Sequence, residues 1–131
     1  MTLSTVARYE PSRTPERGDH AVVVGASMAG LCAARVLADA FARVTVVERD
    51  PLPKEPAVRR GVPQASHIHV LQESGRATLE DLFPGFGEEL LAAGGLLLDA
   101  GEDVRFHMAG GFLDGGRSRQ EIYSATRPLY E

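Results

Sequence analysis

Apolar and small residues dominate the stretch from Ala21 to Asp50, and their spacing changes twice along it. The unbroken β-branched run 22–24 predicts a parallel strand covered on both faces, and Gly25 ends it at a tight turn. Apolar positions then recur at helical spacing, which predicts a helix with one face on the sheet. These positions are Leu31, Ala34, Leu37, Ala38 and Phe41. A second strand, 44–47, stops at the acid Glu48.

This order of strand, turn, helix and strand is typical of the βαβ unit that binds dinucleotides. The turn reads Gly25-x-Ser27-x-x-Gly30, with serine where the pattern has its second glycine. The first glycine permits the turn, the second position lets backbone approach a pyrophosphate, and the third lets helix and strand pack closely. Glu48 follows Gly30 by 18 residues, near the spacing at which an acid reaches the ribose hydroxyls. The cofactor contacts predicted from this unit are Gly25, Ala26, Ser27, Met28, Ala29, Gly30 and Glu48. The alternative is a glycine turn in an unrelated α/β protein.

Composition narrows the class of protein. The 131 residues suit one domain, and 44% hydrophobic with 24% charged residues fits a soluble globular protein. A formal net charge of -4 argues against nucleic-acid binding. No apolar run is long enough to span a membrane and no secretory signal is evident, so we expect a cytoplasmic protein. The single cysteine, Cys32, falls in the first helix, where a buried apolar role is expected.

Outside the βαβ unit the pattern is less regular. Residues 1–19 contain prolines and no sustained periodicity, which predicts a flexible leader. Three prolines within 51–56 predict an extended path. Further elements are expected as helices over 70–82 and 87–93, and as strands over 96–98, 104–108 and 121–125. We therefore expect a leader (1–19), an FAD-binding unit with covering helices (20–95), and the start of an antiparallel region with a truncated helix (96–131).

Three segments together resemble the N-terminal part of FAD-dependent monooxygenases and epoxidases, of the aromatic-hydroxylase class and closest to its actinobacterial polyether-epoxidase-like group. They are Gly-Ala-Ser-Met-Ala-Gly-Leu (25–31), Val-Thr-Val-Val-Glu-Arg-Asp (44–50) and Arg-Arg-Gly-Val-Pro-Gln-x-x-His-x-His-Val-Leu (59–71). The resemblance covers the chain from about residue 21 onward. It implies an α/β fold with a Rossmann-like βαβ FAD-binding unit, followed by helices and the start of an antiparallel region, and it implies that the chain is incomplete.

The resemblance also implies a cofactor and further site residues. In such enzymes NAD(P)H reduces the FAD, and O2 supplies the oxygen atom that is transferred to an organic substrate. An arginine after the second strand contacts the FAD pyrophosphate, and Arg60, or with less weight Arg59, matches that place because a guanidinium offers two parallel donors to a phosphate. The remaining cofactor contacts expected are Arg49, Gln64 and Arg127. No residue is nominated as a catalytic acid or base.

Other interpretations of the sequence stay open. An NAD(P)-dependent Rossmann dehydrogenase, a noncatalytic nucleotide-binding module, and a flavin-dependent halogenase or prenyl reductase share parts of this pattern. An incomplete sheet would leave an edge and apolar surface for a complementary chain or for self-association. His67 and His69 are two residues apart, so an extended segment turns both the same way; no third ligand is evident, and a metal site is not expected.

Overall fold

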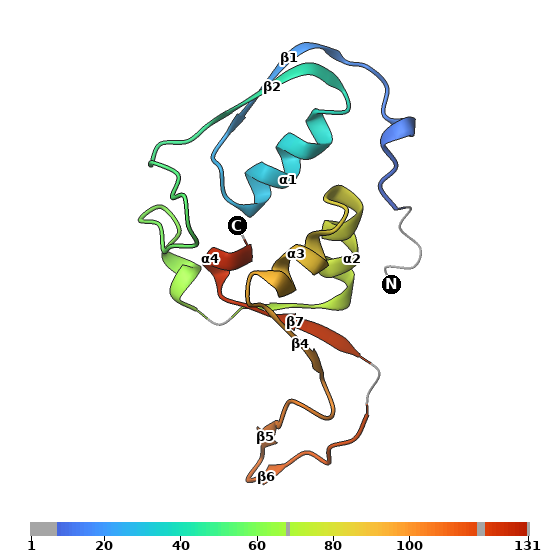
Figure 1. Ribbon diagram of the computed structural model, residues 1–131, viewed down its shortest axis with the longest axis vertical. Helices are drawn as coiled ribbons and strands as arrows, with labels where there is room; N and C mark the ends of the chain where they lie inside the picture. The colour runs from blue at the N-terminus through green and yellow to red at the C-terminus, as the bar shows by residue number, and fades with distance from the viewer. Residues whose placement is uncertain (1–7, 68, 118–119, 131) are drawn as a thin grey trace.

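The protein is described by a computed structural model that covers residues 8–67, 69–117 and 120–130. It is a mixed α/β structure in which helices α1, α2 and α3 lie between a parallel pair of strands and an antiparallel sheet (Figure 1). An arm that contains β5 and β6 projects from the antiparallel sheet. Within these described residues, no helix combines the length and the apolar character needed to cross a membrane.

The predicted strand–turn–helix–strand unit is present. Strand β1 (Gly18–Val24), helix α1 (Met28–Leu37) and strand β2 (Phe41–Val47) follow one another, and β1 pairs with β2 in parallel from Gly18 opposite Phe41 to Val24 opposite Val47. Two boundaries differ from the prediction. Strand β1 begins three residues before Ala21, and Phe41 opens β2 instead of ending the helix, because α1 stops at Leu37.

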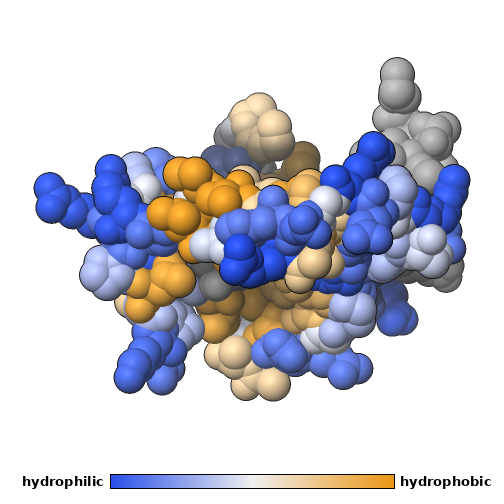
Figure 2. Space-filling view, turned by 90° about the horizontal axis from the view of Figure 1, so that it is seen from above, coloured by the Kyte–Doolittle hydropathy of each residue, from blue (hydrophilic) through white to orange (hydrophobic). Residues whose placement is uncertain are grey.

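The expectation that β1 is covered on both faces is wrong for the described residues. Val23 is 8% exposed, whereas its neighbours Val22 and Val24 are 56% and 84% exposed. Helix α1 contacts both strands, but on the other side nothing in the described chain covers these valines. Figure 2 shows apolar side chains at the surface among hydrophilic ones, seen from the end of the molecule that carries β1 and β2.

The part of the predicted leader that the structure describes has a defined path. Residues 8–17 include the short 3-10 helix η2 (Pro11–Arg13), and the Tyr9 hydroxyl donates a hydrogen bond to the Asp39 carboxylate. The Arg8 guanidinium pairs with Asp81, so the segment is tied to α2 and to the turn that follows α1. Residues 1–7 lie outside the described residues, and the expectation for them stays a prediction.

The helices that follow occur close to their predicted places. The link after β2 ends in the 3-10 helix η3 (Pro63–Ser66), and Val70–Leu71 form strand β3 instead of the first turn of a helix. Helix α2 (Glu73–Leu82) and helix α3 (Phe86–Ala92) are joined by a tight turn. The Glu80 carboxylate closes that turn, because it accepts hydrogen bonds from the Gly85 and Gly87 amides at 2.6 and 3.1 Å.

The antiparallel region is confirmed as a three-stranded sheet in the order β3–β7–β4. Strand β7 (Glu121–Ser124) lies between β3 and β4 (Leu96–Asp99) and buries Ile122. The guanidinium of Arg76 on α2 lies 5.8 Å from the ring centre of Tyr123 on β7. Because β3 belongs to this sheet, the sheet takes strands from both sides of the boundary expected at residue 95.

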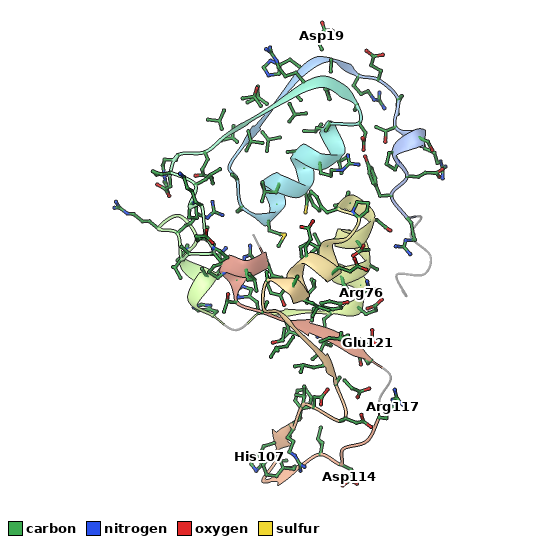
Figure 3. The ribbon with its side chains drawn as sticks, viewed as in Figure 1. Asp19, Arg76, His107, Asp114, Arg117 and Glu121 are labelled. Atoms are coloured by element: carbon green, nitrogen blue, oxygen red, sulfur yellow. The ribbon has the colours of Figure 1, made fainter. Side chains whose placement is uncertain are left out.

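The arm and the C-terminal helix complete the described chain. Of the strand predicted over 104–108 only β5 (His107–Met108) forms, and it pairs with β6 (Gly111–Phe112). His107 and Asp114 lie on this arm, away from the helices (Figure 3). Helix α4 (Arg127–Tyr130) starts where predicted and packs against η3.

Candidate functional site

The glycine turn between β1 and α1 has the tight geometry that its sequence predicts. Gly25 adopts a φ of +99°, a conformation that favours glycine, and its amide donates to the Val47 carbonyl at 2.8 Å. A Cβ atom built on Gly30 would lie 1.9 Å from the Gly25 carbonyl oxygen. The predicted packing role of Gly30 is therefore confirmed: helix and strand approach so closely that only glycine fits.

Ser27 is the residue that immediately precedes α1. It has extended backbone and its hydroxyl makes no capping hydrogen bond to the helix. The first turn of an α-helix leaves backbone N–H groups without partners inside the helix, and these groups attract anions. The turn thus presents a small hydroxyl side chain and a helix N-terminus at the same place.

Glu48 directly follows β2 and lies beside the glycine turn. Its carboxylate accepts a hydrogen bond from the Ala26 amide at 2.7 Å and another from the Asp50 amide at 3.1 Å. These contacts, the one with Ala26 first, hold the pKa of Glu48 below its ordinary value. The structure thus brings the predicted acid and the predicted turn together and keeps the acid ionised.

Arg59, and not Arg60, reaches the glycine turn. The Arg59 guanidinium donates to the Ala26 carbonyl at 3.1 Å and lies 3.9 Å from the Glu48 carboxylate, and its side chain is only 10% exposed. Arg60 is exposed and does not line this site. The chain after its proline-rich path thus turns the first of the two arginines inward, toward the glycine turn.

These groups surround a hollow of about 390 Å³. Its wall includes Gly25, Ser27, Glu48, Arg49, Arg59 and Gly61. The Arg49 side chain is 79% exposed and pairs loosely with Asp50, 3.5 Å away. The hollow therefore has two carboxylates, those of Glu48 and Asp50, with two guanidinium groups and a hydroxyl. Its volume lies within the range of about 300 to 1,000 Å³ that small-molecule sites occupy.

Seven predicted contacts do not line this hollow: Ala26, Met28, Ala29, Gly30, Arg60, Gln64 and Arg127. Ala29 is exposed on α1, and Met28 instead lines an apolar hollow of about 840 Å³ between α1, α2 and α3. Gln64 is an exposed residue of η3, and Arg127 is the half-buried first residue of α4. The contact between α4 and η3 holds Gln64 and Arg127 in one region. That region does not line the hollow at the glycine turn.

Comparison with known proteins shows similarity to a mycobacterial protein. Over 111 residues, which are 84% of this chain, the sequence is 46% identical to a Mycobacterium tuberculosis protein named Protein Rv3254. The matched part is 23% of that protein, so the chain spans about a quarter of the length of this curated relative. No model of a known protein family matches the sequence.

The sequence reasoning missed two residues that shape the site. Asp50 supplies the second amide that binds Glu48, and a Cβ atom on Gly61 would lie 2.7 Å from the Asp50 carboxylate. In the sequence, the position of Gly61 directly after the arginine pair could have indicated a close backbone approach here. A glycine there lets the returning chain pass close to the end of β2.

Neither the histidine pair nor the cysteine forms a metal cluster. Throughout residues 8–67, 69–117 and 120–130, no group of three or more His, Cys, Asp and Glu side chains is placed to hold a metal ion. His67 and His69 instead line a third hollow, beside Leu96 and Ser124. Cys32 lies on α1, and its burial raises the pKa of the thiol, which leaves it less reactive than an ordinary cysteine.

Proposed function

We propose that this chain binds the adenosine diphosphate part of FAD at the glycine turn, and that it serves as the FAD-binding part of a flavin-dependent monooxygenase or epoxidase. The observation that carries the proposal is that Glu48 binds the backbone amide of Ala26 and Arg59 binds its backbone carbonyl, just before the N-terminus of α1. A carboxylate and a guanidinium are the groups suited to ribose hydroxyls and to phosphates, respectively.

The residues around the hollow fit such a ligand. A Cβ atom on Gly25 would meet nothing within 4 Å, so the backbone of the turn is open to close approach by phosphate groups. The Ser27 hydroxyl can donate to a phosphate oxygen, while Glu48 has acceptor capacity left for ribose hydroxyls. The planar guanidinium of Arg59 can offer parallel donors to a pyrophosphate.

FAD would supply the redox chemistry, with NAD(P)H as the electron donor and O2 as the source of the transferred oxygen atom. The protein's part in that reaction is to bind and orient the cofactor and to exclude water from it. The resemblance of the segments 25–31, 44–50 and 59–71 to flavin-dependent monooxygenases supports this assignment over an NAD(P)-dependent dehydrogenase. The substrate is proposed only as a small organic molecule.

Titration of FAD and of ADP against the purified chain tests the proposal. We expect both nucleotides to bind and to compete, and Glu48→Ala to weaken each by about tenfold or more, because a charge-assisted hydrogen bond is lost. Glu88→Ala is the matched control, since Glu88 is an exposed acid on α3. Equal affinity in the wild type and Glu48→Ala would remove the turn from the binding site.

A further inference from the structure

The hollow beside the histidine pair is built from segments far apart in the sequence. His67 and His69 come from the link between η3 and β3, Leu96 from β4, and Ser124 from the end of β7. Ser124 pairs with Val70 on one side and with Leu96 on the other, so the antiparallel sheet itself holds these walls together. The volume of the hollow is about 720 Å³, which is the size of a small-molecule site.

The hydrogen bond of His69 defines what its ring can bind. Its Nδ1 atom lies 2.8 Å from the His67 carbonyl oxygen. A carbonyl oxygen only accepts, so Nδ1 carries the proton, and in the neutral ring Nε2 is then an acceptor. A ligand of this imidazole must therefore offer an N–H or O–H donor.

The rest of the wall restricts the ligand further. Apolar side chains, including Val58, Leu96 and Leu129, line the hollow together with the hydroxyl residues Ser124 and Thr126. Apart from the two histidines, none of the lining residues that the structure describes has an ionisable side chain. A charged ligand would find no counter-charge among these other side chains, whereas an uncharged ligand needs none.

We propose that this hollow binds a small uncharged organic molecule with an apolar body and a hydroxyl group, and that the hydroxyl donates to Nε2 of His69. The hydroxyl groups of Ser124 and Thr126 would form hydrogen bonds with the same polar end of the ligand. Leu96 and Leu129 would contact its apolar body. The site is separate from the hollow at the glycine turn, which has none of these residues in its wall.

The test uses two probes that differ in one donor, 4-methylphenol and 4-methylanisole, at pH 8, where ordinary imidazoles are neutral. The chain has four histidines, so side-chain NMR signals of histidine-labelled protein can report on each. We expect 4-methylphenol to shift the His69 and His67 signals saturably, and 4-methylanisole to bind about tenfold more weakly because it cannot donate.

Variants complete the test. His69→Leu should weaken 4-methylphenol by about tenfold, whereas His69→Gln, which keeps an acceptor near the place of Nε2, should retain most of the affinity. His107→Gln on the arm is the control and should change nothing. ADP affinity should be unchanged in His69→Leu, so failure here is distinguishable from failure of the proposed nucleotide site.

Three results would overturn the proposal: equal affinity for the two probes, equal affinity of wild type and His69→Leu, or shifts centred on His20 or His107. If His69→Leu does not fold, the comparison of the two probes on wild type and His69→Gln decides the matter alone.

Discussion

The parallel pair β1–β2 and the three-stranded antiparallel sheet differ in how their strands are covered. In the antiparallel sheet, β7 has a strand on each side and helix α2 against it, and Ile122 is 7% exposed. In the parallel pair, β1 and β2 have α1 on one side only, and Val24 at the end of β1 is 84% exposed. Yet the glycine turn and Glu48 lie at the ends of this parallel pair, and Arg59 reaches them from the link after β2.

The difference shows that the sequence predicts the geometry of a local turn better than it predicts what covers a strand. The geometry of the glycine turn depends on contacts within about 35 residues, because Gly25, Gly30, Glu48 and Arg59 are close in the chain. The burial of a strand face depends on whatever packs there, which the strand's own residues do not specify. A β-branched run therefore indicates a strand reliably, but indicates its cover only indirectly.

The largest effect should come from Gly30→Ala. The new methyl group would overlap the Gly25 carbonyl oxygen, 1.9 Å away, so α1 must move off β1 or the turn must open. We expect the free energy of unfolding to fall by about 3 kcal/mol or more. Urea unfolding followed by circular dichroism measures this. Gly111→Ala is the control, because its methyl group would meet nothing within 4 Å; equal losses in the two variants would contradict the close packing.

A smaller pair of effects compares the sheets directly. Ile122→Ala should lower the free energy of unfolding by about 2 to 5 kcal/mol, because it leaves a cavity beneath β7. Val24→Ala should change it by about 0.5 kcal/mol or less, because the side chain is exposed. If Val24→Ala costs as much as Ile122→Ala, the valine face is covered in solution by another surface, and the contrast between the two sheets does not hold.

A pH-dependent effect is expected at the turn between α2 and α3. Two amide donors, Gly85 first, hold the pKa of Glu80 below its ordinary value. A lowered pKa means that the carboxylate stabilises the fold above the unfolded-state pKa, and that this stabilisation is lost as the pH falls through the folded-state pKa. Glu80→Gln should therefore cost about 1 kcal/mol near pH 7 and much less at low pH. Exposed Glu88→Gln is the control, and a pH-independent difference would contradict the account.

Much of the fold could be predicted because its signals are local. The β-branched run, the glycine turn and the helical periodicity identified β1, α1 and β2, and the glycines after Ala93 marked the end of α3. The pairing of β3 with β7 could not be predicted in this way. It joins residues more than 50 positions apart, and a two-residue strand has no periodicity of its own.

Part of the candidate site could be predicted because that part, too, depends on residues close together in the chain. The spacing of Glu48 from the turn follows from the length of one helix and one strand, and the structure places the acid there. The choice between Arg59 and Arg60 depends on the backbone direction after a proline-rich link, and adjacent residues on such a link point to different sides. Only the three-dimensional path distinguishes the buried guanidinium from the exposed one.

The most direct test of the central claim is the affinity for ADP of the wild type, Arg59→Gln and Arg60→Gln, measured by calorimetry under identical low-salt conditions. The account predicts that the wild type binds, that Arg59→Gln binds about tenfold more weakly or worse, and that Arg60→Gln stays within about twofold of the wild type. Equal losses in both variants, or a loss in Arg60→Gln alone, would contradict the assignment of Arg59 to the nucleotide site.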